Sequence, residues 1–585
     1  MQVSLLAKYL SRLESTSSRN EITSILADLF KLASPEEIDK ICYLISGRLA
    51  PAYEAIEFNL AEKMIIRVLS KAYAQDANQI ITAYKKNGDL GNIAYELAPT
   101  TGKTLSVSTV YDSLMQIALT QGAGSQEAKI NQFAHLLSQL DRNSARYITR
   151  IPLSKLRLGF SDVTILDALS VMLTGDKSAR LQIEAAFNVT ADIGKIAQQV
   201  RRLGLSGIAH IKVVPGTPVR SSLSERLPSA DKIIEKLGPQ IAVEPKIDGL
   251  RTQLHIFKSE GKKQVRIFSR NLENVTHMFP DLVNEALKLP VQSAIFDGES
   301  IGFNPQTGRF IPFQETVQRK RKHQVGTTVS QIPLKFIIFD ILCLNGKTIM
   351  AAPFINRREI LEKLFQKHKG NLSVIHQKTI SPRQEFLHEF RTAITEGLEG
   401  IMAKKLSVPY QPGGRGFHWV KYKPTTEKLN KTERSKVLDT IDCLVMGYYV
   451  GRGKRSGFGI GGFLAGIYNS QKDAFFTLTK VGTGLTDKQW TELKSRCDKL
   501  ISKEKPIQYH VHKNLTPDYW IAPGLIVELQ ADEITQSPIH TASATTNQKG
   551  FALRFPRLVR FREDKNPNQT TTIPELIRLF KNQRS

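Results

Sequence analysis

The chain has 585 residues, of which 41% are hydrophobic and 23% charged, a composition typical of globular proteins that predicts about three or four domains. Its 81 Lys and Arg residues exceed its 55 Asp and Glu residues and give a formal net charge of +26, which favours a polyanionic partner, either nucleic acid or an anionic membrane surface. The sequence contains no run of about 18 apolar residues, so no membrane-spanning segment is expected.

The four cysteines, Cys42, Cys343, Cys443 and Cys497, lie far apart in the sequence. This spacing suggests neither a CxxC zinc pair nor a compact disulfide framework, so we expect buried free thiols in a reducing compartment. The segment "MQVSLLAKYLSRLES" at the N-terminus lacks the layout of a signal peptide, because charges interrupt its apolar residues. Both observations predict a cytoplasmic protein.

The first two hundred residues predict helices. Segments such as "EITSILADLFKLA", "TVYDSLMQIALTQ" and "VTILDALSVML" place apolar residues three and four positions apart. The segment "SPEEI" predicts a helix start with Ser34 as the N-cap and Glu37 closing a capping box. We therefore predict an all-α domain over residues 1–205, which is either a scaffold or a basic clamp on nucleic acid.

Two polar segments mark the next domain boundaries. Pro and Ser cluster in "PGTPVRSSLSERLPSA", after which strand-like runs alternate with helices, and this pattern predicts an α+β domain over residues 206–432. The charged segment "KPTTEKLNKTERSKVLD" precedes short β-type runs separated by Gly-rich or charged loops. These runs predict a small β-barrel over residues 433–585.

The sequence argues against two common nucleotide-binding motifs. The segment "GFGIGG" from Gly457 formally matches GxGxxG, but "FLAGIYN" follows it and predicts a strand. A dinucleotide site needs a helix there, so we reject that interpretation. A P-loop is also not expected, because the sequence contains no GxxxxGK[ST].

The segment "VEPKIDGLR" places Glu244, Lys246, Asp248 and Arg251 where a strand is predicted to end. A lysine with its ordinary pKa of about 10.4 must lose its proton before it can act as a nucleophile, and burial or nearby cations favour that loss. Gly249 would let backbone or ligand approach closely. By itself the K-x-D-G pattern is short, and a solvated surface loop is the alternative.

Further segments follow in the order "FSRN", "IFDGES", "FDIL", "EGLEGIMAKK", "RGFHWVKYK" and "LRFPRLVRFREDK". With "EPKIDGLR" this series resembles the ATP-dependent DNA ligases, within the nucleotidyltransferases that form a covalent lysyl-adenylate. The resemblance covers essentially the whole chain. It implies a multidomain protein with an all-α DNA-binding domain, an α+β adenylation domain and a C-terminal OB-fold β-barrel.

The resemblance also implies a role for individual residues. Lys246 corresponds to the nucleophile, and Glu299 and Glu399 correspond to carboxylates on the metal side of the site. Glu299 also corresponds to a ribose-contacting position. The remaining positions correspond to residues that bind the nucleotide or its phosphates: Glu244 at the base, Phe339 stacked on it, and Arg251, Arg270, Arg415, Lys421, Lys423, Arg554, Arg557, Asp564 and Lys565 around the phosphates.

The implied cofactors are ATP, with AMP carried on the lysine, and Mg²⁺ or Mn²⁺. Hard oxygen ligands such as Glu299 and Glu399 suit Mg²⁺. The implied partner is nicked double-stranded DNA, which the basic chain would encircle as a monomer near the nucleoid, with roles in replication, repair and recombination. A sliding clamp is a further candidate partner, although no convincing clamp-binding peptide is present.

Several of these residues have a simpler interpretation. Phe339 lies in an apolar run and could be a core residue, and Glu399 could be a charge at a helix end. Arg557 and Arg560 could form a solvated strand face. The basic run "QRKRKH" from Gln318 is either a solvated loop or a contact with DNA phosphates.

Several other functions are compatible with part of this sequence. RNA ligases and capping guanylyltransferases also carry K-x-D-G, but the large helical N-terminal region argues against both. An NAD-dependent ligase would be expected to carry a four-Cys zinc site, which this sequence lacks. A non-catalytic DNA-binding protein on a ligase scaffold is disfavoured because Lys246, Glu299 and Lys421 are all present.

Overall fold

The structure, a computed structural model, describes the chain apart from residues 155, 157, 228, 312, 317–318, 320–331, 382, 424–439, 452–456, 546–547 and 584–585. The chain forms two compact units, Met1–Tyr422 and Lys423–Ser585. Within the described ranges, no helix is long and apolar enough to cross a membrane. The segment "KPTTEKLNKTERSK" after its first residue, Lys423, and most of the basic run from Gln318 lie outside the described residues.

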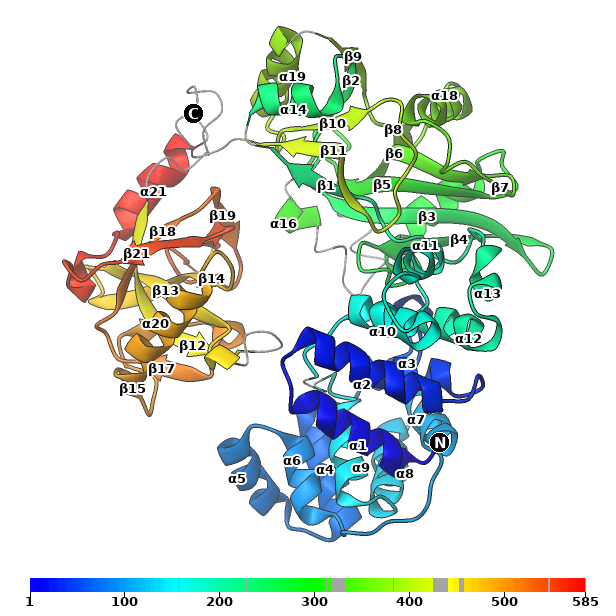
Figure 1. The fold of residues 1–585 in the computed structure, drawn as a ribbon. Helices are drawn as coiled ribbons and strands as arrows, with labels where there is room; N and C mark the ends of the chain where they lie inside the picture. The colour runs from blue at the N-terminus through cyan, green and yellow to red at the C-terminus, as the bar shows by residue number, and fades with distance from the viewer. Residues whose placement is uncertain are drawn as a thin grey trace. The chain divides into compact units, whose positions relative to one another are not determined.

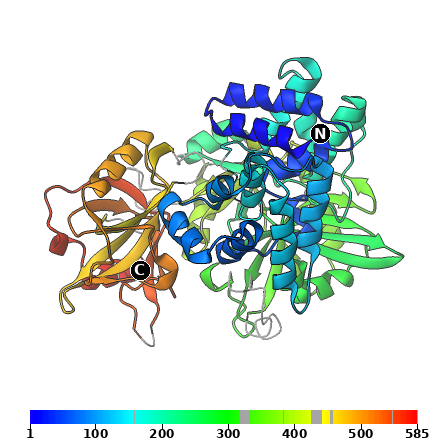
Figure 2. The same ribbon diagram turned by 90° about the horizontal axis from the view of Figure 1, so that it is seen from below.

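The first part of unit one is built from helices, as predicted (Figures 1 and 2, blue to cyan). Their apolar faces share one core, which runs from Val3 to Ile208. The helices are α1 Val3–Glu14, α2 Arg19–Leu32, α3 Ile38–Ile45, α4 Glu62–Tyr73, α5 Ala77–Asn87, α6 Leu90–Leu97, α7 Val107–Leu119, α8 Ser125–Ser138, α9 Arg142–Arg150, α10 Asp162–Thr174, α11 Arg180–Thr190, α12 Ile193–Leu203 and α13 Ser206–Ala209.

One helix start differs from the prediction. The helix α3 begins at Ile38, not after Ser34, because residues 35–37 form a turn in which the Ile38 N–H donates to the Ser34 carbonyl at 3.1 Å. The Glu37 carboxylate, expected to close a capping box, instead binds the N-terminal ammonium of Met1 at 2.6 Å. A contact with the chain terminus therefore replaces the local cap.

The rest of unit one contains two sheets with helices packed on them, which confirms the predicted α+β pattern. One sheet has the order β1-β11-β10-β2-β9, with β1 parallel to β11 and the other pairs antiparallel. Its strands are β1 Leu223–Arg226, β2 Ile241–Pro245, β9 Lys378–Ile380, β10 Ile401–Lys405 and β11 Arg415–Tyr422. Helices α14 (Ala230–Leu237) and α19 (Arg383–Thr395) bury their apolar residues against it.

The second sheet has the order β4-β3-β5-β6-β7, with β8 parallel to β6. Helices α15 (Pro280–Leu287) and α18 (Phe354–Phe365) pack on this sheet, and the short α16 spans Phe313–Thr316. The strands are β3 Leu250–Ser259, β4 Lys262–Ser269, β5 Ala294–Gly302, β6 Leu334–Leu344, β7 Lys347–Thr348 and β8 Leu372–Val374. A mixed apolar cluster that contains Phe339 of β6 and Trp419 of β11 joins the two sheets.

Unit two is mostly β-structure (Figure 1, yellow to red). Its main sheet runs β15-β17-β12-β13-β14-β16, and β18 joins β12 to β21, while β19 and β20 form a separate pair. The strands are β12 Ile441–Tyr449, β13 Gly462–Asn469, β14 Ala474–Val481, β15 Ile501–Ser502, β16 Tyr509–His510, β17 Tyr519–Ile521, β18 Ile526–Gln530, β19 Glu533–Ser537, β20 Gly550–Arg554 and β21 Arg557–Phe561.

Two features of unit two bear on the predictions. The strands among the described residues do not close into a ring, so their pairing does not by itself define a barrel. The segment after "GFGIGG" is strand β13, as predicted, which removes the helix that a dinucleotide site would need. Helices α20 (Asp487–Asp498) and α21 (Ile573–Asn582) complete the unit.

Candidate functional site

Lys246 lies directly after β2, whose buried residues anchor it. Its N–H donates to the Gly400 carbonyl at 2.8 Å, and the Glu399 N–H donates to the Lys246 carbonyl at 3.3 Å. The loop that follows approaches β5 closely, since a Cβ on Gly249 would lie 2.6 Å from the Ser300 carbonyl oxygen. Gly249 is therefore required for the close approach that the sequence suggested.

The side chains of Lys246 and Glu399 form an ion pair. The Nζ atom of Lys246 lies 2.6 Å from Oε2 of Glu399, and the two side chains are 22% and 16% exposed. Residue 399 immediately precedes β10, so it is not the helix-end charge of the alternative interpretation. The nucleophile predicted by the sequence thus lies beside one of the two predicted metal-side carboxylates.

Glu299 on β5 is the second of these carboxylates. Its Oε1 accepts the Gly249 N–H at 3.2 Å, which ties it to the loop that carries Lys246. Burial raises the pKa of Glu299 to about 7, while the positive charges of Lys246 and Arg251 act in the opposite direction. A carboxylate in such surroundings would be held ionised by a bound cation.

The residues fit a small divalent cation by their chemistry. Glu299 and Glu399 offer hard carboxylate oxygens around one lysine. Mg²⁺ is usually held by one or two carboxylates together with substrate phosphates and water, not by a complete protein cage. This agrees with the finding that, within the described ranges, no group of three or more His, Cys, Asp or Glu could hold a metal.

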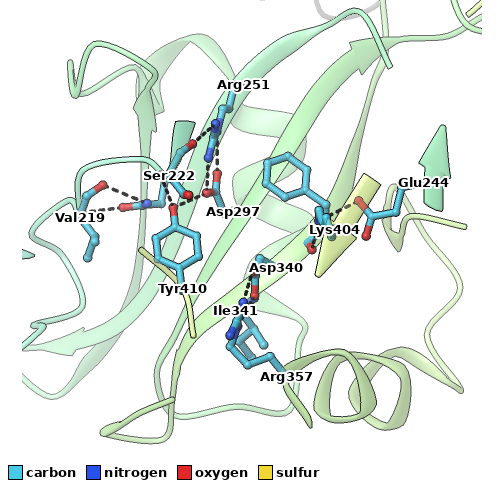
Figure 3. Close-up of polar contacts among 12 residues, drawn as sticks. Val219, Ser222, Glu244, Arg251, Asp297, Asp340, Ile341, Arg357, Lys404 and Tyr410 are labelled. Carbon is cyan, nitrogen blue, oxygen red and sulfur yellow. Dashed lines mark hydrogen bonds and ion pairs between the residues drawn. The ribbon is translucent and has the colours of Figure 1, made fainter. Parts of the chain in front are cut away.

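Arg251 is held by a buried polar network (Figure 3). Its Nε and Nη2 bind the two oxygens of Asp297 at 3.2 and 2.7 Å, and its Nη1 donates to the Ser222 carbonyl at 2.7 Å. The hydroxyl of Tyr410 donates to Asp297 at 2.7 Å and accepts the Ser222 N–H at 2.9 Å. This network fixes the guanidinium, whose carbon lies 5.3 Å from the Phe339 ring centroid.

Phe339 is half-buried and meets the Trp419 ring edge to face, with 5.8 Å between the centroids. Nζ of Lys404 lies 5.0 and 4.5 Å from the centroids of these two rings. It forms a buried ion pair with Oε2 of Glu244 at 2.7 Å (Figure 3). Met402 of β10 pairs with Lys421 of β11 on one side and with Glu244 of β2 on the other. Cross-strand partners share a face of a sheet, so Lys421 and Glu244 lie on the same face. Five of the predicted positions, Lys246, Glu244, Glu299, Phe339 and Lys421, thus come from neighbouring strands.

The other predicted residues of unit one are more dispersed. Arg270 is exposed directly after β4. Arg415 begins β11, but its side chain lies outside the described part of the chain. Within the basic run from Gln318, Arg319 is described: it is buried and bonded to Asp281 at 2.6 Å, so this member of the run is not a solvated residue.

In unit two, three of the predicted phosphate-facing residues, Arg554, Arg557 and Lys565, have acidic neighbours. Nη1 of Arg554 lies 3.6 Å from Oε2 of Glu533, and Nη2 of Arg557 lies 2.6 Å from Oδ1 of Asp532. Lys565 lies 2.6 Å from Asp442, whose other oxygen binds Arg562, and Arg562 also pairs with Asp564. Lys423, which begins this unit, lies with its Nζ 5.7 Å from the Phe555 ring centroid.

Sequence reasoning missed four residues of this site: Asp297, Lys404, Tyr410 and Trp419. Asp297 lies two residues before Glu299, and Trp419 lies two residues before Lys421. Alternation along a strand places such pairs on one face, so this signal could have found both. Lys404 and Tyr410 carried no comparable signal, because the first is one of two adjacent lysines and the second lies in a loop.

Three ligase family models match parts of the chain. The family described as "ATP dependent DNA ligase domain" matches residues 221–423, "DNA ligase N terminus" matches 2–170, and "ATP dependent DNA ligase C terminal region" matches 456–565. The chain belongs to the ATP-dependent DNA ligase family.

Individual relatives extend over nearly the full chain. A probable DNA ligase of Dictyoglomus turgidum is 43% identical over 581 residues, covering 99% of this chain and 97% of the relative. DNA ligase 2 of Thermofilum pendens is 40% identical over 600 residues, with 99% and 97% covered. The solved structure "Pmar-Lig_Pre." is 17% identical, covers 95% of this chain and 99% of its own, and has a TM-score of 0.57, which shows a shared fold.

Proposed function

We propose that this enzyme seals nicks in duplex DNA with ATP, through an AMP adduct on Lys246. The observation that carries the proposal is the position of Lys246 beside Glu399, with Glu299 tied to the same loop. The Lys246 nitrogen attacks the α-phosphate, a nitrogen–phosphorus bond forms, and pyrophosphate leaves. AMP then passes to the 5′-phosphate of the nick, and the 3′-hydroxyl displaces it as the phosphodiester bond forms.

The residues of unit one divide into three groups. Glu244 reads the adenine and Phe339 stacks on it, because the Phe339 ring is half-buried among residues of both sheets. Arg251, Arg270, Arg415 and Lys421 contact the nucleotide or its phosphates, as does Lys423 at the start of unit two. Glu299 and Glu399 hold Mg²⁺ or Mn²⁺, which when bound would screen the phosphate charge.

The position of Glu399 suggests how Lys246 becomes a nucleophile. Oε2 of Glu399 lies 2.6 Å from Nζ of Lys246, so this ion pair must open before the nitrogen can attack phosphorus. If Glu399 held a divalent cation, that cation would supply positive charge beside the phosphates, and Lys246 would lose its anionic partner. Glu399 would then serve in turn as the partner of Lys246 before ATP binds and as a metal ligand afterwards.

The domain assignment follows the same scheme. Residues 1–205 form the helical DNA-binding domain, residues 206–432 the adenylation domain, and residues 433–585 an OB-fold. Support for the OB-fold comes from the short antiparallel strands of unit two and from its match to the ligase C-terminal family. In the OB-fold, Arg554, Arg557 and Lys565 would act on the triphosphate.

We further propose that the chain is a cytoplasmic, nucleoid-associated monomer that acts in DNA replication, repair and recombination, with a sliding clamp as a candidate partner. The net charge of +26 supports the DNA partner, because Lys and Arg that neutralise phosphates release counterions on binding.

The test is incubation with α-labelled ATP or with NAD⁺ labelled in its adenylyl group, followed by a denaturing gel. A covalent label from ATP, but not from NAD⁺, is expected. Chasing the labelled protein with nicked duplex should transfer the label to DNA and then release it as AMP. Absence of any covalent label from ATP with Mg²⁺ or Mn²⁺ would refute the proposal.

A further inference from the structure

Lys404 is a buried lysine with no role in the function proposed above. It is 1% exposed, although lysine is almost never fully buried unless paired. Its Nζ lies 2.7 Å from Oε2 of Glu244 and donates to the backbone carbonyl of Phe339 at 3.1 Å. One ammonium group thus contacts both the residue expected to read the base and the residue expected to stack on it.

Three aromatic rings surround this ammonium. The ring centroids of Trp419, Phe354 and Phe339 lie 4.5, 4.6 and 5.0 Å from Nζ. Ring faces attract a cation, and this attraction is strongest where water is excluded. Lys404 is therefore fixed in position. Burial lowers its pKa, and the negative charges of Glu244 and Asp340 act in the opposite direction.

Glu244 is equally buried, at 1% exposure. Its Oε2 binds Lys404, but its Oε1 has no hydrogen-bond partner among the residues that the structure describes. A buried carboxylate oxygen without a donor costs free energy, so such an atom points to a ligand that supplies one. Lys246 follows two residues later, and the alternation of a strand places both side chains on one face.

The charge on Glu244 depends on its neighbours. Burial raises its pKa, while the cations of Lys404 and Arg358 act to lower it and Asp340 acts to raise it. Lys404 contacts the carboxylate directly and is the charge that most favours its ionised form. Without Lys404, the carboxyl group would take up a proton more readily and become a hydrogen-bond donor as well as an acceptor.

Resting on the proposed function, we propose that Lys404 is a positioning residue that sets the base specificity of self-adenylation. It holds Glu244 as an ionised, acceptor-only group for the 6-amino group of adenine. Guanine carries a carbonyl oxygen at that position, and an ionised carboxylate rejects it because both groups accept hydrogen bonds. A protonated Glu244 could donate to that oxygen, so loss of the Lys404 charge should admit GTP.

The experiment measures kcat/KM of self-adenylation with ATP, GTP and the triphosphate of purine riboside, which lacks the 6-amino group. The variants are Lys404→Met, Lys404→Gln and the double variant Glu244→Gln with Lys404→Met, in the full-length chain. Lys405→Met is the matched control, because Lys405 is the next residue of β10 and points to the other face of the sheet. Thermal unfolding of each variant reports whether it folds.

Wild type should prefer ATP over GTP by at least about a hundredfold, as expected of a site that hydrogen-bonds the base. In Lys404→Met the ratio of kcat/KM for ATP to kcat/KM for GTP should fall by at least about tenfold, chiefly because KM for ATP rises. The corresponding ratio for ATP and purine riboside triphosphate should fall as well. The double variant, which has no unpaired charge, should fold and also discriminate poorly, because an amide both accepts and donates. Lys405→Met should keep the wild-type ratios.

Three results separate the possible failures. If wild type forms no adduct with ATP, the proposed function is wrong. If wild type forms the adduct but Lys404→Met loses activity equally with all three nucleotides, Lys404 is structural and this inference is wrong. If Lys404→Met does not fold, the test uses Lys404→Gln, because glutamine keeps a neutral donor of similar size. An unchanged ATP-to-GTP ratio of kcat/KM in that variant would also overturn the inference.

Discussion

The Nζ atom of Lys246 lies 2.6 Å from Oε2 of Glu399, and the backbones of the two residues are also hydrogen-bonded. The two residues are 153 positions apart in the sequence, and the pairing of β2 with β10 brings them together. The contact links the proposed nucleophile to a proposed metal ligand, so chemistry at one should depend on the other.

The first prediction concerns the nucleophile. Lys246→Arg keeps a cation for Glu399 and should fold, but a guanidinium stays protonated and cannot attack phosphorus. Both this variant and Lys246→Ala should therefore form no covalent AMP adduct on a denaturing gel with α-labelled ATP. Lys405→Arg, on the opposite face of β10, is the control and should label normally. A normal yield of adduct in either Lys246 variant would show that another residue carries the AMP.

The second prediction concerns the carboxylates. Glu299→Gln and Glu399→Gln should each lower the rate of adenylation or of a later step by well over about tenfold, because an amide is a poorer ligand for a hard cation. Glu396→Gln, an exposed neighbour of the same length, is the control. Single-turnover measurement of each step would identify the affected one. Wild-type rates at every step with both carboxylates replaced would make them structural.

The same Glu299→Gln variant tests the raised pKa. The folded-state pKa of Glu299 is about 7, above its ordinary value of 4.5, so the stability that the group contributes is present below pH 4.5 and lost as the pH rises to about 7. In the absence of metal and nucleotide, Glu299→Gln should thus gain stability relative to wild type across this window, by about 1–3 kcal/mol. Urea unfolding at pH 4.5, 6 and 8 measures it; a difference that does not change with pH would contradict the assigned shift.

The sequence predicted the order of the domains and the residues nearest the proposed chemistry, because both depend on local patterns. Apolar spacing is enough to predict helices such as α7 and α10, and the charged motifs carry Lys246, Glu299 and Glu399. The contacts among these motifs could not be derived from spacing. They depend on strand register, such as the opposition of Glu244 to Met402, which joins segments far apart in the chain.

Two of the misses have physical reasons. The helix start predicted at Ser34 was wrong, because the Glu37 carboxylate binds the terminal ammonium of Met1 and does not close a capping box. Local sequence patterns do not predict such a contact. Lys404 resembled a surface lysine in the sequence, because its buried partner Glu244 and the rings around it come from segments far apart in the chain. Long-range partners decided both cases.

The third prediction concerns the network around Arg251. Arg251 and Asp297 form a buried pair, with side chains 17% and 0% exposed. Asp297→Asn leaves the guanidinium without its counter-charge and should destabilise the chain by about 3–5 kcal/mol. The matched control is Asp231→Asn, which removes the partner of Arg383 in an exposed pair and should cost about 0–1 kcal/mol. Urea unfolding compares the two, and equal effects would show that the network is not specially important for the fold.

The fourth prediction concerns DNA binding by the helical region. Its core includes residues up to Ile208, and Ile211 packs against it, so a fragment of residues 1–211 retains the whole core. This fragment should bind nicked and intact duplexes of unrelated sequence with similar affinity. Binding should weaken by at least about a hundredfold between roughly 50 and 200 mM salt, because phosphate contacts release counterions. A folded fragment that fails to bind at low salt in fluorescence anisotropy would remove this role, although not the ligase activity.

The basic residues of unit two raise a different question, because each already has an acidic partner in its own unit. Arg554, Arg557 and Lys565 pair with Glu533, Asp532 and Asp442. To act on a triphosphate, these cations must exchange a carboxylate for a phosphate. Such an exchange keeps each charge neutralised before and after ATP binds, and a phosphate of higher charge can compete with a carboxylate for the same cation.

The last prediction follows from this exchange. Lys565→Ala should slow self-adenylation by at least about tenfold, because one cation that orients the leaving pyrophosphate is lost, while sealing of a nick that already carries AMP should change much less. Arg554→Ala should behave in the same way. Lys581→Ala, which replaces an exposed lysine on α21, should leave both steps unchanged.

Asp442→Asn provides an opposite test. It removes the carboxylate partner of Lys565 and should lower KM for ATP. Because Arg562 also loses a partner, urea unfolding must show that this variant is folded. The two steps are measured separately under single-turnover conditions. If Lys565→Ala slows only the sealing of pre-adenylated nicks, these cations serve DNA and not ATP, and the exchange of partners does not occur in the adenylation step.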